Sequence, residues 1–221
     1  MFWRTCVAFL GLISTGAPRC QADDHPALQK LAAAKEAYRL EQQRFQKEAQ
    51  DWFTRRENAA RMQGDKAAVD AVQQERELFS ERGILSPQAL STLKRKGQTM
   101  RRKMEQALQD AIKECVKARL DAQATAIERE LLVFRSGGAI GDQRWLWKHS
   151  KGEFRLLEPG LWQEKSTGGL YRYRELGRTA EYVEIHALNG DTSIRVRLNQ
   201  ATSDYGHIPQ LQFRTNFAGG W

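Results

Sequence analysis

The stretch GLWQEKSTGGLYRYREL, residues 160–176, predicts two short β-strands joined by a tight turn. On both sides of its Gly-Gly pair, aromatic residues alternate with polar ones, which is typical of strands that bury one face. Glu164 and Glu175 fall on the same faces as Trp162 and Tyr173, because side chains two residues apart in a strand point the same way. The stretch therefore predicts a β-hairpin with two carboxyl groups on its aromatic face.

This hairpin lies inside a longer β-meander. Turn signals recur about every ten residues between His149 and Gly190, which predicts six short antiparallel strands. The expected cross-strand pairs are Trp147 with Phe154, Leu156 with Trp162, Trp162 with Tyr173, Glu164 with Tyr171, Tyr173 with Val183, Ile185 with Ile194, and Val183 with Val196. All of these residues fall on one face, and a slip of one residue would turn a strand over. The pattern predicts an open antiparallel sheet or a small barrel.

The opposite face of the meander is expected to contact solvent. Glu184 is placed opposite Arg195, and Tyr182 opposite Arg197. One alternative function, a ligand-binding module, could use aromatic residues or the residues of this outer face. Tyr182, Arg195 and Arg197 are therefore the candidate ligand-binding residues.

The two carboxylates admit a structural and a catalytic interpretation. A carboxylate on a buried face must be paired, hydrogen-bonded or protonated. We expect Glu164 and Glu175 to be structural polar residues at the core or rim, held by a tyrosine hydroxyl or by a basic residue such as Arg178. The alternative is a hydrolase that uses Glu164 and Glu175 as a pair. That chemistry needs an open cleft between the carboxylates, and a narrow meander filled with side chains leaves little room, so we expect no catalytic residue.

Residues 23–135 have the composition of helices, being rich in Ala, Gln, Glu, Lys and Arg. A seven-residue apolar repeat comprises Leu31, Tyr38, Phe45, Trp52 and Ala59. Such a repeat requires a partner helix and is typical of coiled coils. Gly64 interrupts the run and Asp65 is suited to cap a new helix, which predicts a helical hairpin.

The helical pattern continues beyond this hairpin, and it fits either one hairpin or two. Gly83 is placed at the end of one helix, and Ser86-Pro87 at the start of a long third segment that passes through Leu93 and reaches Leu120. The sequence ERELF at 75–79 returns as ERELLVF at 128–134, which suits a duplicated hairpin. The chain is thus predicted to be of the α+β class, with a helical region at 23–135, a Gly-containing linker at 136–143 and an antiparallel β module at 144–221.

Residues 1–22 have the order of a secretory signal peptide: Arg4, a short apolar run, then small residues before Asp23. The run is too short to span a bilayer comfortably, so we expect a secreted or periplasmic protein with no stable membrane span after cleavage. Cys115 would then be the single cysteine of the mature chain, which excludes an internal disulfide.

The formal net charge of +8 is spread over the chain. Residues 23–135 carry 22 Lys and Arg against 18 Asp and Glu, and residues 136–221 carry 11 against 9. This distribution does not favour a nucleic-acid partner. The one dense basic cluster, residues 94–103, fits either an anionic surface or a solvated helix face.

Motifs for metals and cofactors are not found in the sequence. The four histidines are scattered, and no Cys-x-x-Cys or His-Glu-x-x-His spacing occurs. No phosphate loop, dinucleotide fingerprint or Gly-x-Ser-x-Gly is present. We expect neither a metal nor a cofactor.

The segment GLWQEKS, followed by YRYRELGRTAEYVEIHALNGDTSIRVRL, resembles a small W-x-E β module of uncharacterised secreted proteins from planctomycete bacteria. The preceding RRENAARMQGDKAAVDAVQQERELF is similar to the helical hairpin region of the same proteins. Ile185 and Leu176-Gly177 depart slightly from that pattern. The resemblance implies the fold and export, and it implies no catalytic residue.

These observations predict an exported, non-enzymatic interaction or scaffold protein of the cell envelope. Its partner would be a protein or an envelope polymer, and the helical region could form a homo-oligomer. The alternatives are a module that binds polysaccharide or another ligand and, with less support, a carboxylate-pair hydrolase.

Overall fold

The structure is a computed structural model that describes residues 25–83, 85–210 and 212–221. A helical region comes first in the chain and an antiparallel β-barrel follows, which confirms the α+β class. The helices are α1 (Pro26–Met62), α2 (Lys66–Arg82), α3 (Ser91–Lys117) and α4 (Asp121–Arg135). The strands are β1 (Leu146–His149), β2 (Gly152–Glu158), β3 (Leu161–Ser166), β4 (Gly169–Arg178), β5 (Tyr182–Ala187), β6 (Ile194–Asn199), β7 (Thr202–His207) and β8 (Arg214–Gly220).

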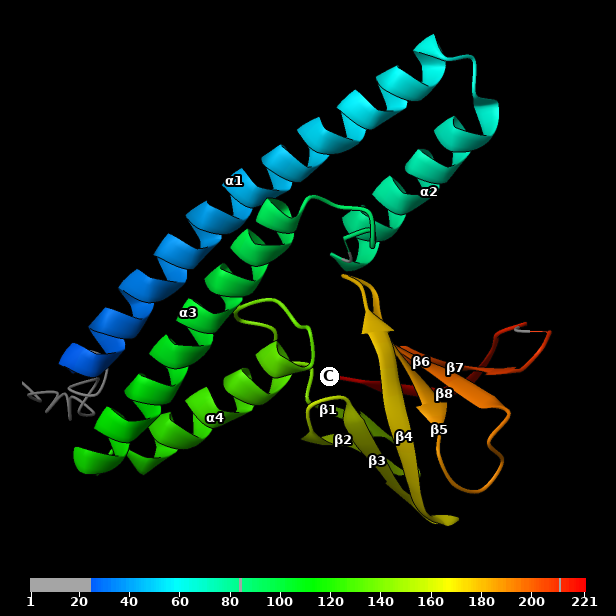
Figure 1. Cartoon of the computed structure of the whole chain (residues 1–221). Coiled ribbons are helices and arrows are strands. Elements are labelled where there is room, and N and C mark those ends of the chain that lie inside the picture. Colours follow the sequence, from blue (N-terminus) through cyan, green and yellow to red (C-terminus); the bar gives the residue numbers. More distant parts are fainter. Residues whose placement is uncertain (1–24, 84, 211) are drawn as a thin grey trace, which may run out of the picture.

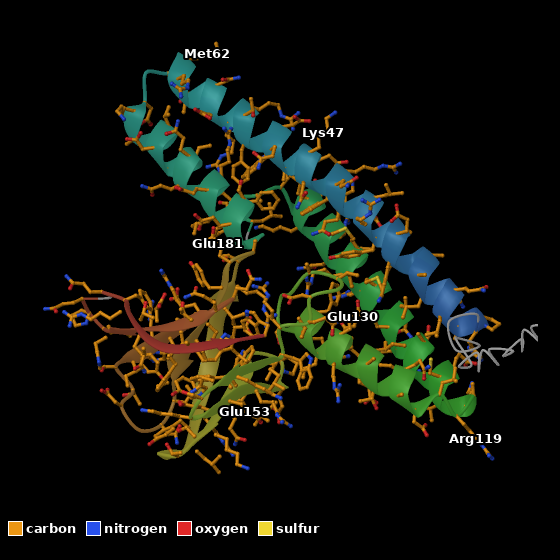
Figure 2. The ribbon with its side chains drawn as sticks, turned by 180° about the vertical axis from the view of Figure 1, so that it is seen from behind. Lys47, Met62, Arg119, Glu130, Glu153 and Glu181 are labelled. Carbon is orange, nitrogen blue, oxygen red and sulfur yellow. The ribbon has the colours of Figure 1, made fainter. Side chains whose placement is uncertain are left out.

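The helices form two antiparallel hairpins, α1 with α2 and α3 with α4 (Figure 1). The long α1 contacts both hairpin partners: α2 lies along its C-terminal part and α3 along its N-terminal part. The α1–α2 hairpin extends beyond the rest of the molecule as an arm that ends at Met62 (Figure 2). α4 folds back from α3 toward the barrel, so it links the two regions.

The apolar seam of α1 follows the predicted repeat for four of its five members. Leu31, Tyr38, Phe45 and Trp52 are buried. Ala59 is exposed, and its neighbour Ala60 is buried instead. An unsupercoiled helix has 3.6 residues per turn, so a strict seven-residue repeat drifts around it and the buried stripe advances by one residue. The change of partner from α3 to α2 along α1 accompanies this drift.

Two predicted helix ends are confirmed and one is wrong. The carboxylate of Asp65 accepts a hydrogen bond from the amide of Ala68 at 2.9 Å, and Gly83 ends α2 in a left-handed conformation. The next helix begins at Ser91 and not at Ser86-Pro87. The Ser86 hydroxyl instead accepts from the amide of Gln88, which makes a turn that delays the helix.

The break between α3 and α4 was not predicted from the sequence. It falls at residues 118–120, where no Gly or Pro marks it. Arg119 adopts a left-handed conformation with φ of 58°, which costs a non-glycine residue on the order of 1 kcal/mol. Burial of Ala124 and Ile127 on α4 against the helical core offsets this cost.

The eight strands pair in sequence order and close into a barrel, β8 returning to β1. The first three predicted registers are confirmed, since the pairs are Trp147 with Phe154, Leu156 with Trp162, Trp162 with Tyr173, and Glu164 with Tyr171. Closure requires Gly219, because a Cβ there would lie 2.2 Å from the carbonyl oxygen of Lys148. The predicted six strands miss β7 and β8, whose Ser, Thr, Asp and Gly content gives a weak strand signal.

The two later registers were predicted wrongly. Tyr173 lies opposite Ala187, and Val183 lies opposite Arg178, because β4 continues through the expected turn. Gly177 forms a bulge in that strand and does not end it.

The β5–β6 pairing is shifted by two residues from the prediction. Val183 pairs with Leu198 and Ile185 with Val196, so each side chain keeps its predicted face. Asn189-Gly190 does not form a two-residue turn. The side-chain oxygen Oδ1 of Asn189 accepts a hydrogen bond from the backbone amide of Arg172 on β4 at 2.5 Å, and the loop is longer.

The barrel interior is filled by its own side chains. The members with no exposed surface are Trp147, Phe154, Trp162, Val183, Ile185, Val196 and Leu198. Val133 of α4 joins this core, while its neighbour Phe134 joins the helical core. α4 is therefore shared by both cores.

The segment 136–143, predicted as a linker, packs against both regions. The Ser136 hydroxyl accepts a hydrogen bond from the amide of Gly160, and the amide of Gly141 donates to Glu130. A Cβ on Gly138 would lie 2.6 Å from a methyl of Val133. These contacts hold the barrel against α4 (Figure 2). Among the described helices, none is long and apolar enough to cross a membrane.

Candidate functional site

Glu164 lies inside the barrel and is 5% exposed. Its carboxylate accepts a hydrogen bond from the hydroxyl of Tyr173 at 2.6 Å. Burial and this bond raise the pKa of Tyr173 well above its usual value, so the phenol keeps its proton. Burial likewise raises the pKa of Tyr205, whose hydroxyl lies beside that of Tyr173. Glu164 is thus enclosed by phenols and does not open onto a cleft.

His149 lies near the same end of the barrel. Its ring stacks on Phe217 with centroids 4.7 Å apart and lies 5.6 Å from the rings of Trp147 and Phe154. Both ring nitrogens are buried and have no hydrogen-bond partner among the described residues. Burial lowers the pKa of His149, and the charge of Glu164 opposes this effect. The imidazole therefore behaves as an aromatic core residue that is neutral at pH 7.

Glu175 lies near the other end of the barrel in a buried ion pair. The guanidinium of Arg178 donates to both of its oxygens, at 2.7 and 2.8 Å, and the indole of Trp162 donates to one of them at 2.8 Å. Residues three apart in a regular strand face opposite sides, and the bulge at Gly177 places these two on the same side. The unpredicted bulge is therefore what builds this pair.

Asp142 and Arg144 extend the pair into a four-residue charge network. Arg178 also donates to Asp142 at 3.1 Å, and Arg144 donates to both oxygens of Asp142 at 2.9 to 3.0 Å. Burial alone would raise the pKa of Asp142, but the bonds from Arg144 and the charge of Arg178 hold it below its usual value. Burial disfavours the charge of Arg178 as well, yet Glu175 raises its pKa overall. We call these four residues, Asp142, Arg144, Glu175 and Arg178, the mouth network.

Tyr182, Arg195 and Arg197 lie together on the outer face of β5 and β6. Glu184 lies between the two arginines, 3.4 Å from Arg195 and 3.0 Å from Arg197. The Arg197 guanidinium lies 4.6 Å from the ring centroid of Tyr182 and 4.0 Å from that of Phe213. The three residues therefore lie together, but they are half-buried and not exposed as expected, Glu184 between them is buried and neutralises part of their charge, and Phe213 covers part of their surface.

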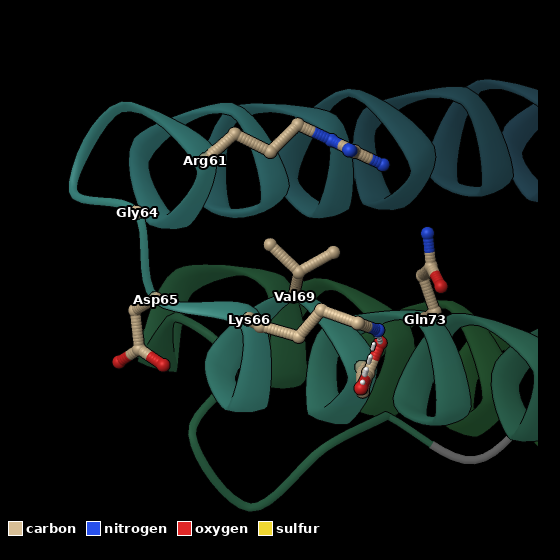
Figure 3. Close-up of a pocket in the computed structure, with 7 residues that line it drawn as sticks. Arg61, Gly64, Asp65, Lys66, Val69 and Gln73 are labelled. Atoms are coloured by element: carbon tan, nitrogen blue, oxygen red, sulfur yellow. Dashed lines mark hydrogen bonds and ion pairs between the residues drawn. The ribbon is translucent and has the colours of Figure 1, made fainter.

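Among the surface hollows of the described residues are three that neither Glu164 nor Glu175 lines. The first, of about 430 Å³, lies between α1 and α2 near the tip of the arm (Figure 3). There Lys66 pairs with Asp70 at 2.8 Å, and Val69 lies between the helices. The second, of about 220 Å³, is a shallow groove between α1 and α3. The third, of about 870 Å³, lies at the barrel end beside the mouth network.

The basic cluster at 94–103 is partly engaged within the helical region. Lys96 pairs with Glu48, and Arg101 donates to the carbonyl of Phe134 at 2.5 Å while lying over its ring. Arg95 and Arg102 point outward and are exposed. Lys103 is exposed as well, so about half of the cluster is engaged with neighbouring segments and the other half contacts solvent.

Sequence reasoning missed Asp142, Arg144 and Trp221. The signal that could have found the first two is an Asp-x-Arg pair directly before the first aromatic strand, where a charge can reach the buried Arg178. Trp221 lies after β8, a strand that was itself missed, and its ring packs edge-on against Trp162 at 6.0 Å.

The described residues contain no group of three or more His, Cys, Asp or Glu side chains arranged to hold a metal ion. Cys115 is buried in α3 and free. No family model, no curated protein and no solved structure matches the chain.

Proposed function

We propose that the chain is an exported, non-enzymatic interaction or scaffold protein of the cell envelope. The observation that supports this proposal best is the filled interior of the barrel, where both candidate carboxylates are engaged by internal donors. A carboxylate held in this way lacks the open cleft that hydrolysis requires. We therefore expect the outer surfaces of the arm and the barrel to bind the partner.

The junction between the two regions supports a scaffold role. α4 shares its residues between the two cores, and the segment after it is bonded to the barrel. A partner bound to the arm and a partner bound to the barrel would therefore be held at a fixed spacing. Coiled-coil association of the helical region into a homo-oligomer belongs to this proposal.

The proposed localisation outside the cytoplasm rests on residues 1–22, which lie outside the described residues. N-terminal sequencing of the protein from its native cells should find a chain that begins near Asp23 and is located outside the cytoplasm. An intact Met1 in a cytoplasmic pool would contradict export.

The interaction itself is tested by affinity capture from the cell-envelope fraction. The full mature chain should enrich a specific partner, and Arg95→Glu combined with Arg102→Glu should weaken capture if the exposed basic face of α3 is used. Lys66→Glu, which changes charge at the tip of the arm, is the matched control. Turnover of any substrate in a hydrolase panel, lost in both Glu164→Gln and Glu175→Gln, would favour the carboxylate-pair enzyme instead.

A second candidate function is ligand binding by Tyr182, Arg195 and Arg197. The placement of Arg197 between two aromatic rings favours it, because such a guanidinium is held in position for an anionic group. Glu184 competes for both arginines, so Glu184→Gln should strengthen binding to an acidic polysaccharide on a glycan array. The exposed Glu181→Gln is the control, and equal responses of the two variants would contradict a site at this face.

A further inference from the structure

The hollow of about 870 Å³ at the barrel end is built from four separate segments. Its lining residues are Arg144, Ala180, Glu181, Asn199, Gln200, Ala201, Thr202, Gly220 and Trp221. They come from the approach to β1, the β4–β5 turn, the β6–β7 turn and the end of β8. Glu181 marks this end of the barrel in Figure 2, and Glu153 marks the opposite end. Its volume falls in the range of sites that hold small ligands.

The wall of this hollow is held rigidly by the mouth network. Arg144 donates to Asp142 and to the backbone carbonyls of Thr179 and Ala180, which fixes the β4–β5 turn. Asp142 is in turn bonded to the buried Arg178. A supporting layer of buried, fully paired charges is the arrangement that preorganises a binding site.

The groups that face the hollow suit a hydroxyl-bearing ligand. Trp221 is half-buried and offers an apolar ring at the wall. Its ring packs in a T-shaped contact with Trp162, and the guanidinium of Arg144 lies 5.9 Å from its centroid. Gln200 and Glu181 are exposed and supply planar amide and carboxylate groups, and Thr202 adds a hydroxyl. Sugars pair an apolar C–H face with a rim of hydroxyls, and this lining complements both parts.

The charge of the hollow selects against acidic ligands. A guanidinium has five N–H groups, and the bonds to Asp142, Thr179 and Ala180 occupy four of those of Arg144. The exposed carboxylate of Glu181 would repel an anion. We infer that this hollow is a binding site for a neutral saccharide. This site is distinct from the outer cluster of Tyr182, Arg195 and Arg197 and from any surface used by a protein partner.

The test is titration of the full mature chain with neutral hexasaccharides of glucose, mannose and xylose, followed by NMR and calorimetry, with hexagalacturonate as the acidic probe. At least one neutral hexasaccharide should bind saturably with Kd below about 1 mM, and hexagalacturonate should bind at least tenfold more weakly. Trp221→Ala and Gln200→Ala should each weaken binding at least tenfold. Gln212→Ala, an exposed glutamine outside the hollow, should leave binding unchanged.

Trp221→Ala loses its contact with Trp162, so its folding is checked by circular dichroism. Gln200→Ala changes an exposed side chain and keeps the test valid if Trp221→Ala does not fold. The inference is overturned by failure of all three neutral hexasaccharides to bind, by preference for hexagalacturonate, or by binding that is indifferent to Gln200→Ala. None of these results affects the envelope-capture experiment, so the two proposals fail separately.

Discussion

The helical region and the barrel each bury an apolar core but differ in the charged groups they enclose. Among the described residues, the helical region buries one charged side chain, Glu130, which pairs with Lys35 at 2.6 Å. The much smaller barrel buries Glu164, Arg178 and Glu184. In an apolar core, the loss of stability caused by a substitution increases with the volume of side chain removed. A buried ion that loses its partner instead remains charged in an environment that solvates it poorly. The two regions should therefore respond differently to single substitutions.

The largest effect is expected for Arg178→Met in the mouth network. Removal of the guanidinium leaves Glu175 and Asp142 buried and without their shared cation, and their carboxyl side chains are only 3% and 6% exposed. Breaking a buried pair in this way costs about 3 to 5 kcal/mol. Urea unfolding followed by tryptophan fluorescence measures the change, since Trp162 donates to Glu175.

Arg174→Met is the matched control for this prediction, because Arg174 is exposed on the same strand. A substitution at such a surface position changes stability by less than about 0.5 kcal/mol. Equal losses for the two variants would show that the mouth network does not stabilise the barrel.

In the helical region the largest effect is expected for Trp52→Ala. Trp52 is 6% exposed and packs edge-on against Phe53 with centroids 4.7 Å apart. Truncation of a buried tryptophan costs about 3 kcal/mol or more. Circular dichroism at 222 nm during urea unfolding follows the loss. Met62→Ala, at a position 90% exposed, should have almost no effect, and a comparable loss in both variants would contradict the packed hairpin.

The helical region was largely predictable because its signals are local and periodic. The seam from Leu31 to Trp52 and the cap at Asp65 depend on residues within a few turns of each other. The reversal at Arg119 was not predictable in this way. It is imposed by packing of α4 on α3, which overrides a sequence with no breaker residue.

The barrel was predictable in its faces but not in its closure. Alternation assigned Trp162, Tyr173 and Ile185 to the interior, and an error of two residues in register left these faces unchanged. The bulge at Gly177 and the return of β8 to β1 depend on pairs that are distant in the sequence. The mouth network joins Asp142 to Glu175 through Arg178, and no local pattern reports such a contact.

A smaller effect is expected for Glu164→Gln. The amide oxygen of glutamine can still accept from the hydroxyl of Tyr173, but the bond is no longer charge-assisted. Since charged hydrogen bonds contribute about 1.5 to 3 kcal/mol and neutral ones about 0.5 to 1.5, stability should fall by about 1 to 2 kcal/mol. Thermal melts beside Glu153→Gln, a more exposed carboxylate, measure the difference. An unchanged or higher melting temperature would contradict a structural role and favour a functional one.

The smallest effect is the pH dependence contributed by His149. Burial lowers the pKa of its imidazole in the folded protein, so below the unfolded pKa of about 6.5 the unfolded state binds more protons. Stability must therefore decrease as the pH falls. For one group the loss of stability at pH 5.5 is at most about 1.4 kcal/mol.

His149→Phe keeps the stacked contact with Phe217 and removes the titration. The free energy of unfolding in urea should therefore differ less between pH 7.5 and pH 5.5 in this variant than in the wild type. The carboxylate of Glu164 is the opposing charge that stabilises an imidazolium, and in Glu164→Gln the difference should grow. A wild-type pH dependence that survives His149→Phe intact would mean that His149 accepts a proton inside the folded barrel as readily as it does in water.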